Sequence, residues 1–167
     1  MSKIANYLRS HIAGSVSTRA DWCASVSADA GILAATPELV VVPRVVSDIR
    51  KITRFAWQMA EKGHRMPVVT RGAGCGALGG AVGQGILLDT AALDTIFEYD
   101  GKSQRVRVQP GVLAHNLTVA LSMQGAGVGP LANQRGTVGG VLAAGVRGTT
   151  LSRTTDFAEA IDQLEVV

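Results

Sequence analysis

The sequence has few of the residues that mark disulfide-rich, metal-binding or membrane-spanning proteins. Its two cysteines, Cys23 and Cys75, are far apart and form no CxxC pair, so we expect no disulfide framework and no zinc or iron–sulfur site. The three histidines fall on separate segments without ligand spacing, and no metal is expected. Residues 1–12 alternate apolar and polar types, which is typical of neither a signal peptide nor a membrane span. We therefore expect a cytoplasmic protein without a transmembrane segment, in contact with a membrane only through partners.

Charged residues are also sparse, and neither sign dominates. They make up 17% of the chain, with 16 basic against 13 acidic residues and a formal charge of +3. These charges form no long run, so the clustered basic stripe of a nucleic-acid-binding protein is missing and no nucleic acid is expected as a partner. Hydrophobic residues make up 47% and the mean hydropathy is +0.23, which indicates a core-forming chain whose surface is partly covered by something else.

Glycine is abundant, with 20 residues, and it separates short apolar segments that predict a parallel sheet. The segments 39–42 (LVVV), 66–70 (MPVVT) and 86–89 (ILLD) have the short apolar runs of strands that are buried on both faces. Between the first two, a helix is expected from Ser47 as its N-cap to Gly63 as its stop. The expected inward positions of this helix are Ile49, Ile52, Ala56, Met59 and Ala60. The pattern predicts a β-α-β unit followed by a third strand.

The second half of the chain predicts a hairpin, a helix and a terminal strand. The segments on either side of Asp100-Gly101 alternate apolar and polar residues, which is typical of a β-hairpin. A helix is expected over 112–124, and its expected inward positions are Leu113, Leu117, Val119, Ala120 and Met123. Residues 164–167 (LEVV) predict the start of a strand, and its unpaired edge would favour self-association.

Residues 71–85 form a glycine-rich segment with seven glycines and no helical periodicity. Gly74, Gly76 and Gly79 match the GxGxxG fingerprint of a Rossmann fold, but that fingerprint requires a helix that opens directly at the loop. Further glycines up to position 85 oppose a helix, at about 1 kcal/mol each relative to alanine. We predict a loop between two strands, either a nest of backbone N–H groups for an anion or an ordinary glycine-rich turn. A second cluster, 136–140 (GTVGG), suggests the same close approach of backbone to a ligand.

Six segments stand in an order that is typical of one family of flavoproteins. They are 37–43 (PELVVVP), 47–49 (SDI), 67–74 (PVVTRGAG), 88–89 (LD), 108–111 (VQPG) and 136–140 (GTVGG). From about position 18 to the last residue, the chain resembles the FAD-binding domain of the vanillyl-alcohol oxidase and p-cresol methylhydroxylase superfamily. Within it, Asp29 and the 81–89 segment favour the FAD-linked D-lactate dehydrogenase and glycolate oxidase group.

The resemblance implies an α+β fold in which FAD lies extended between two small α/β subdomains, the second of them incomplete in this chain. It implies a helical lead-in at 1–36, a first FAD-binding subdomain at 37–99, and the start of the second at 100–167. The cofactor would be held by residues of both subdomains.

The resemblance also implies which residues contact FAD. Backbone groups of the first loop would hold the pyrophosphate: Arg71, Gly72, Ala73, Gly74, Cys75, Gly76, Ala77 and Gly79. The second cluster would approach the pyrophosphate and ribityl chain: Gly136, Thr137, Val138, Gly139 and Gly140. Pro110 and Gly111 would lie along the flavin. Thr155 and Asp156 match the family's Gly-Thr-Thr-x-Asp stretch, in which Arg153 replaces the glycine.

Relatives that bind the flavin covalently carry a histidine at the position of Cys75, and cysteine cannot form that bond, so we expect non-covalent FAD. Cys75 is then either a small residue packed near the cofactor or a reactive thiol. By resemblance, the chain is the FAD-binding portion of an oxidoreductase that oxidises a small 2-hydroxy acid of the D-lactate or glycolate type by hydride transfer to FAD. Catalytic residues would lie in a missing C-terminal substrate domain or a second chain, and none is assigned here. The alternative is a stand-alone or vestigial flavin-binding module without catalysis.

Overall fold

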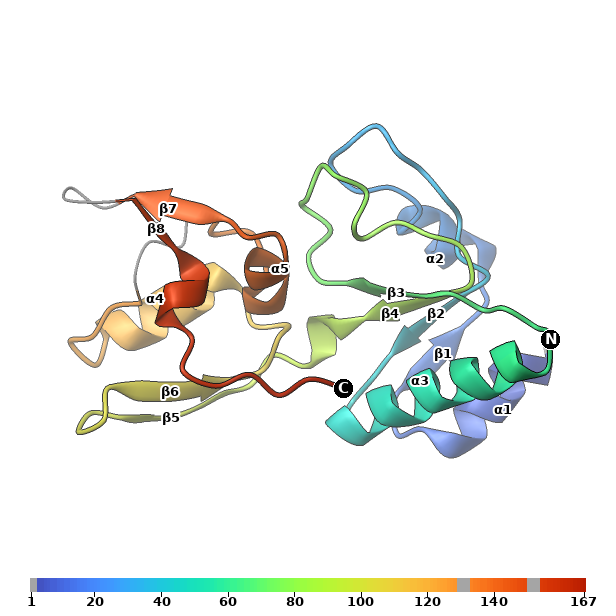
Figure 1. The fold of residues 1–167 in the computed structure, drawn as a ribbon, viewed down its shortest axis with the longest axis horizontal. Coiled ribbons are helices and arrows are strands. Elements are labelled where there is room, and N and C mark those ends of the chain that lie inside the picture. The colour runs from blue at the N-terminus through green and yellow to red at the C-terminus, as the bar shows by residue number, and fades with distance from the viewer. Residues whose placement is uncertain (1–2, 129–132, 150–153) are drawn as a thin grey trace. The chain divides into compact units, whose positions relative to one another are not determined.

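The structure is a computed structural model that describes residues 3–128, 133–149 and 154–167. The chain divides into two compact units, 1–92 together with Val167, and 93–166 (Figure 1). Both units mix helices and strands, so the expected α+β class is confirmed. The division expected at 99/100 would fall inside a hairpin, whereas the structure divides at 92/93.

The first unit is built on a four-stranded sheet in the order β1-β2-β4-β3. Its elements are α1 (Lys3–His11), β1 (Ser15–Ser17), α2 (Ala20–Ser25), β2 (Leu39–Val42), α3 (Val46–Glu61), β3 (Val68–Arg71) and β4 (Ile86–Asp89). The strands expected at 39–42 and 86–89 are confirmed, and the strand expected at 66–70 lies at 68–71. β2, β4 and β3 run parallel, while β1 pairs antiparallel with β2. The lead-in expected to be helical at 1–36 contains α1 and α2 but also β1, and α1 belongs to the core of this unit.

The sheet is covered on both faces, which explains why its central strands are apolar throughout. Leu39 and Val41 pack with Ile86 and Leu88 against α1 and α3. The alternate residues Val40 and Leu87 pack on the other face with Cys23 and Val26 from the α2 region. Figure 1 shows α1 and α3 together on one side of the sheet, and α2 with the long loops on the other. Successive side chains of a strand point to opposite faces, so both sets must be apolar when both faces are buried.

The start of α3 is fixed by a buried carboxylate and not by Ser47, which was expected to be the N-cap. The helix begins at Val46, and the Asp48 side chain is fully buried. Its carboxylate accepts N–H groups from Ala13 at 2.9 Å, Gly14 and Arg44 at 3.0 Å, and Val45 at 3.4 Å. Burial by itself raises the pKa of Asp48, but these four donors outweigh it and hold the pKa below its ordinary value.

The predicted end of α3 is confirmed at Gly63. This residue has φ of 82° and donates its N–H to Ala60, while the His64 N–H donates to the Met59 carbonyl. That pair of bonds is the Schellman arrangement, in which glycine is favoured because the left-handed φ costs it nothing. Of the expected inward positions, Ile52 and Ala56 are buried and Ala60 is exposed.

The second unit comprises short elements around its own core. They are β5 (Ile96–Asp100), β6 (Arg105–Val108), α4 (Ala114–Ser122), α5 (Val138–Ala143), β7 (Arg147–Thr149), β8 (Thr154–Asp156) and a 3₁₀ turn (Phe157–Ala160). The predicted hairpin is confirmed, with β5 and β6 antiparallel and β7 paired antiparallel with β8. The core of this unit contains Val112, Leu117, Leu121 and Phe157.

Two expectations for the second unit were wrong. Helix α4 buries Ala114, Leu117 and Leu121, whereas Leu113, Val119 and Met123 are exposed. The helix begins at Ala114, so Leu113 precedes it and the inward stripe follows a spacing of three and four from Ala114. Residues 164–167 form no strand, since no partner strand pairs with them in the described part of the chain.

Candidate functional site

The glycine-rich loop between β3 and β4 contains no helix, as predicted. Three of its glycines have a positive φ: 65° at Gly74, 76° at Gly79 and 79° at Gly85. L-residues rarely adopt this conformation, so the path of the loop depends on glycine at these positions. The Rossmann interpretation is therefore excluded by the local structure, because no helix N-terminus opens at the loop.

Asp29 ties this loop to the segment that follows α2. Its carboxylate accepts the Gly79 N–H at 2.9 Å and the Gly31 N–H at 2.8 Å. Beside it, the Ala30 N–H donates to the Gly76 carbonyl at 2.9 Å. A side chain at residue 31 would overlap the Ala77 carbonyl, so the two segments are in direct backbone contact. Asp29 contributed to the resemblance stated from the sequence, but its bonding partners follow only from the structure.

Arg71 fastens the same two segments from the end of β3. One guanidinium nitrogen, Nη1, donates to the carbonyls of Ala28 at 3.0 Å, Ala81 at 3.3 Å and Val26 at 3.4 Å. The rest of the guanidinium lies where a Cβ of Gly74 would be, so that glycine leaves room for it. The Arg71 carbonyl accepts the hydroxyl of Thr90.

Other parts of the loop have an accessible backbone. A Cβ at Gly76 or Gly80 would meet no atom within 4 Å. Within the described residues, no backbone or side-chain acceptor takes the N–H groups of Ala73, Gly74 or Gly76. Exposed donors on a left-handed turn are the ingredients of an anion-binding nest. Cys75 is half-buried in this segment and forms no disulfide.

The second glycine cluster is structured differently, because it starts a helix. Thr137 caps α5 by accepting the Gly140 N–H at 3.2 Å. The Val138 N–H donates to the Val112 carbonyl at 2.7 Å, and the Gly139 N–H to the Pro110 carbonyl at 2.9 Å. These three N–H groups are therefore already bonded within the protein, and the expected approach of this cluster to FAD stays a prediction.

These bonds bring 110–112 and 136–140 together, which the sequence predicted only as contacts to a shared ligand. A Cβ at Gly139 would lie 2.8 Å from the Pro110 Cβ and 3.1 Å from the Pro110 carbonyl oxygen. Glycine at 139 is therefore required by close packing within this unit. Gly111 is buried and donates its N–H to the Leu93 carbonyl at 2.8 Å.

The remaining expected contacts lie on β8. The backbone of Thr155 pairs with Gly148 in β7, and Asp156 ends the strand. The Asp156 carboxylate accepts the Ala158 N–H at 3.2 Å and so begins the 3₁₀ turn. Arg153, which replaces the expected glycine, lies outside the described residues.

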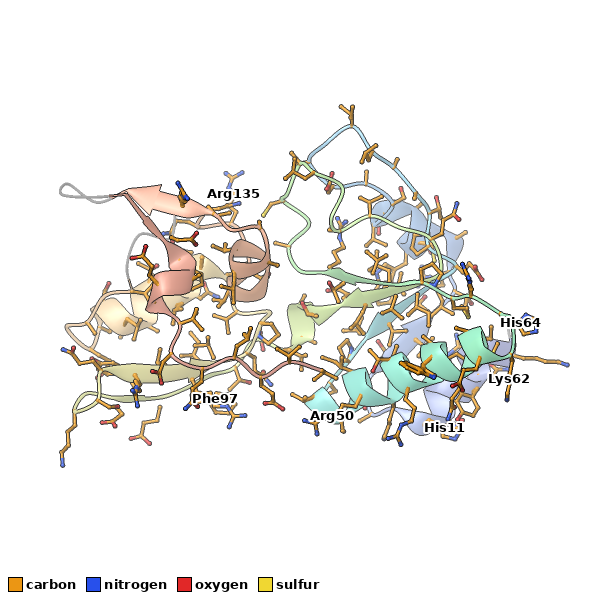
Figure 2. All side chains as sticks on the ribbon, viewed as in Figure 1. His11, Arg50, Lys62, His64, Phe97 and Arg135 are labelled. Carbon is orange, nitrogen blue, oxygen red and sulfur yellow. The ribbon has the colours of Figure 1, made fainter. Side chains whose placement is uncertain are left out.

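No metal site forms among the residues that the structure describes. His11 ends α1 and His64 follows α3, both with exposed side chains (Figure 2), and His115 is exposed on α4. Within these residues no three His, Cys, Asp or Glu side chains gather as a metal would require. Likewise, none of the helices over the described ranges combines the length and apolarity needed to cross a bilayer.

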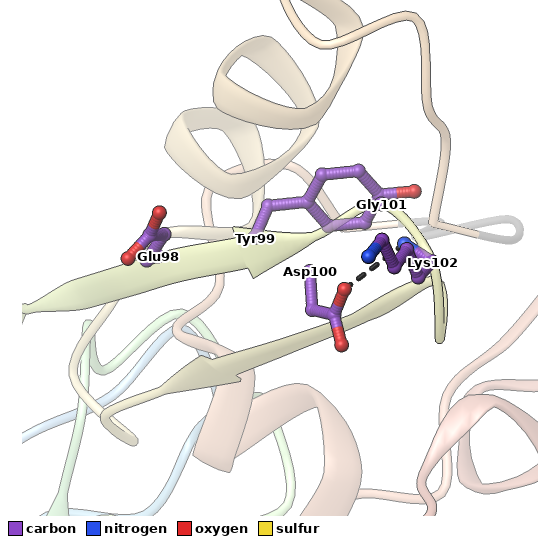
Figure 3. Close-up of a pocket in the computed structure, with 5 residues that line it drawn as sticks. All are labelled: Glu98, Tyr99, Asp100, Gly101 and Lys102. Carbon is purple, nitrogen blue, oxygen red and sulfur yellow. Dashed lines mark hydrogen bonds between the residues drawn. The ribbon is translucent and has the colours of Figure 1, made fainter.

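A pocket lies at the turn of the β5–β6 hairpin and contains none of the predicted residues. It is lined by Glu98, Tyr99, Asp100, Gly101 and Lys102 (Figure 3). The Asp100 carboxylate accepts the Lys102 N–H at 2.9 Å and the Ser103 hydroxyl at 2.7 Å. The Ser103 hydrogen bond, with the backbone bonds, lowers the pKa of Asp100. The carboxylate thus stabilises the hairpin turn, and nothing about the pocket indicates a ligand.

Known proteins match most of the chain. A family model described as "FAD binding domain" matches residues 37–167. The glycolate oxidase subunit GlcD of Escherichia coli (strain K12) is 38% identical over 86 residues, which are 50% of this chain and 16% of that protein. D-2-hydroxyglutarate dehydrogenase of the same strain is 31% identical over 138 residues, 79% of this chain and 13% of that protein. The chain therefore spans less than a fifth of the length of either relative.

Solved structures share the fold. An alkyldihydroxyacetonephosphate synthase is similar with a TM-score of 0.74 over 87% of this chain and 29% of its own, at 14% sequence identity. At that identity the likeness concerns the fold alone.

Proposed function

This chain belongs to the FAD-binding domain family, and from that membership we propose that it is the FAD-binding part of an oxidoreductase that oxidises a small 2-hydroxy acid. FAD is the cofactor of this domain. The names of the two sequence relatives refer to glycolate and to D-2-hydroxyglutarate, and both compounds carry a hydroxyl next to a carboxylate. When bound, FAD supplies the acceptor for the hydride that leaves the hydroxyl-bearing carbon.

The observation that carries the proposal is the accessible backbone of the glycine loop. The N–H groups of Ala73, Gly74 and Gly76 have no acceptor within the described part of the chain, and the space above Gly76 is open. A diphosphate fits such a cradle, because its oxygens need several donors and a backbone without side chains. The Arg71 guanidinium beside Gly74 adds a positive charge.

The second cluster serves the cofactor in another way. Its N–H groups at Val138, Gly139 and Gly140 are bonded within the protein, so we assign it no direct hydrogen bond to the pyrophosphate from these three groups. Its contribution is a rigid surface in which α5 holds the Pro110-Gly111 turn. Pro110 and Gly111 are proposed to lie along the flavin.

Binding is proposed to be non-covalent. Cys75 stands in the loop where a histidine would be needed for a histidyl bond. Substrate binding and the catalytic base are assigned to protein outside these 167 residues, since the two relatives are several times longer than the matched region. No catalytic role is assigned to the residues of this chain.

The first experiment is a titration of the purified chain with FAD, followed by quenching of flavin fluorescence. We expect saturable binding that is tighter for FAD than for FMN, and we expect ADP to compete with FAD, because the glycine loop is proposed to recognise the diphosphate. Equal affinity for FMN, or no binding of FAD, would contradict the proposal. Light scattering on the same sample tests self-association. We expect self-association because the apolar side chains of Leu164 and Val166 are exposed.

The substrate class is tested on the chain together with the protein encoded next to it. Reduction of an artificial electron acceptor is measured with D-lactate, glycolate and D-2-hydroxyglutarate, and with the matching 2-hydroxy amides as controls that lack the carboxylate. Turnover of the acids alone supports the proposal. FAD binding without turnover of any acid would instead favour a flavin-binding module without catalysis.

A further inference from the structure

We propose that Asp29 and Arg71 are positioning residues that hold the glycine loop in its binding conformation before FAD arrives. The inference rests on the proposed flavin site. Neither side chain needs to touch the cofactor for this role, because each acts through the backbone of the loop.

The Asp29 carboxylate bridges two segments that are far apart in the sequence. One oxygen accepts the Gly31 N–H in its own segment, and the other accepts the Gly79 N–H in the glycine loop. Gly79 has φ of 76°, so this bond holds a residue in a conformation that a free chain samples only part of the time. The carboxylate is half-buried, which strengthens both bonds relative to open solvent.

Arg71 stands where the loop begins, and its guanidinium reaches the carbonyl of Ala81, two residues beyond Gly79. Its Nη1 donates hydrogen bonds to the carbonyls of Val26 and Ala28 at the end of α2 and just after it, and to the carbonyl of Ala81 in the loop. The carbonyl of Val26 is at the C-cap of α2, where a cation is favourable. The guanidinium then lies directly against Gly74, whose N–H is one of the proposed diphosphate donors. The two side chains therefore clamp the loop at Gly79 and Ala81, and the Arg71 guanidinium also fills the space beside Gly74.

Other contacts hold the loop at single points: the Gly76 carbonyl accepts the Ala30 N–H at 2.9 Å, Val82 donates to Gly79, and Gly83 packs closely on Val69. Between these points the loop is largely exposed and rich in glycine. An unanchored glycine segment has many conformations, and binding a ligand would have to select one of them. A loop that is already ordered avoids this loss, so the clamp raises the affinity for any ligand bound by 73–76.

The experiment uses four variants of the chain: Asp29→Ala, Asp29→Asn, Arg71→Met and Arg71→Lys. Matched controls are Asp21→Ala and Arg65→Met, which change exposed side chains in the same unit. Amide hydrogen exchange at Ala30, Gly31 and Gly79 is measured without FAD, and FAD affinity is measured separately by fluorescence. Thermal unfolding monitors the stability of the whole unit.

Asp29→Ala should speed exchange at Gly31 and Gly79 about tenfold, since each amide loses a charge-assisted hydrogen bond. FAD affinity should fall by a similar factor while the melting temperature stays near that of Asp21→Ala. Asp29→Asn keeps one acceptor oxygen, so it should protect one of the two amides and restore part of the affinity. Arg71→Lys keeps the charge but ends one bond short of the Nη1 position, so it should restore little of what Arg71→Met loses.

Unchanged exchange at both Gly31 and Gly79 in Asp29→Ala would overturn the inference, even if FAD affinity fell. Faster exchange throughout the sheet would also overturn it, because the role would then be general stability. If Arg71→Lys fully restored FAD affinity and amide protection, the positive charge would matter and the hydrogen bonds of Nη1 to the carbonyls would not. If the unaltered chain binds no FAD, the proposed function fails, while the exchange data still decide whether the clamp orders the loop.

Discussion

The glycine loop at 72–85 and the cluster at 136–140 share a composition but differ in the state of their backbone. In the loop, glycines take left-handed φ values, and within the described residues the N–H groups of Ala73, Gly74 and Gly76 have no acceptor. In the cluster, Val138, Gly139 and Gly140 already donate to acceptors of the same unit, and a helix begins. The loop needs glycine for its conformation and for open access. The cluster needs it so that α5 can pack against Pro110.

The units that carry these clusters differ in their buried polar groups as well. The first unit buries the carboxylate of Asp48, whereas the polar side chain buried in the described part of the second unit is the neutral Thr137. Both groups cap a helix, but only one carries a charge. Substitutions and pH should therefore affect the two units separately.

The largest effect is expected from Asp48→Asn. The amide has one acceptor oxygen for four N–H donors, so buried donors lose partners, and we expect a loss of about 3 kcal/mol from the free energy of unfolding. Both tryptophans, Trp22 and Trp57, lie in the first unit, so urea unfolding followed by tryptophan fluorescence reports on it. Asp21→Asn is the control, because Asp21 is exposed and should change little. Equal stability of Asp48→Asn and the unaltered chain would contradict the role given to this carboxylate.

Acid should act through the same carboxylate. The pKa of folded Asp48 lies below that of an unfolded aspartate, which is about 3.9. Its contribution is therefore complete above that pH and is lost as the pH falls through the folded pKa. The tryptophan-monitored stability of the first unit should fall below about pH 4, and this dependence should be weaker in Asp48→Asn. A pH dependence that is the same in both chains would assign the acid sensitivity to other groups.

A smaller effect is expected from Gly139→Ala in the second unit. The added methyl would lie 2.8 Å from the Pro110 Cβ, and relieving that overlap should cost about 1–3 kcal/mol. The second unit has no tryptophan, so amide exchange in α4 and α5 measures its stability. Gly127→Ala is the matched control, since a Cβ there meets nothing within 4 Å. If FAD affinity falls while exchange is unchanged, the cluster contacts the cofactor directly, as the sequence first suggested.

Much of the first unit could be predicted from the sequence. The apolar runs at 39–42 and 86–89 have only one suitable environment, a strand buried on both faces, and Gly63 ends α3 through its left-handed φ. The absence of a helix after Gly74 followed from the density of glycine alone. These features depend on local chemistry, which a sequence shows directly.

The missed features depend on partners that are distant in the sequence. Strand β1 is only three residues long and is defined by its pairing with β2. Asp48 looks like an ordinary first-turn acid until Ala13 and Gly14 are placed beside it. Helix α5 contains two glycines, and its formation depends on the Thr137 cap and on the bonds to 110–112. In the same way, glycine content alone could not distinguish the open loop after β3 from the packed start of α5 at 136–140.

The smallest effects, and the sharpest test of the open loop, are expected from a pair of neighbouring glycines. Gly74→Ala places a side chain at φ of 65°, which costs about 1–2 kcal/mol, and it also displaces the Arg71 guanidinium. Gly76→Ala has neither problem, because a Cβ there is in open space, so the stability without FAD should change by less than about 0.5 kcal/mol.

Both variants should nevertheless bind FAD more weakly, since a diphosphate seated on this backbone would occupy the space that either methyl enters. Gly76→Ala is the decisive one, as its loss of affinity cannot come from a damaged fold. Gly80→Ala, which is equally open but lies outside the donor segment, is the control. Flavin fluorescence measures affinity, and tryptophan fluorescence during urea unfolding measures stability. Retention of full FAD affinity by Gly76→Ala would mean that the N–H groups of Ala73, Gly74 and Gly76 face solvent and that the diphosphate is held elsewhere.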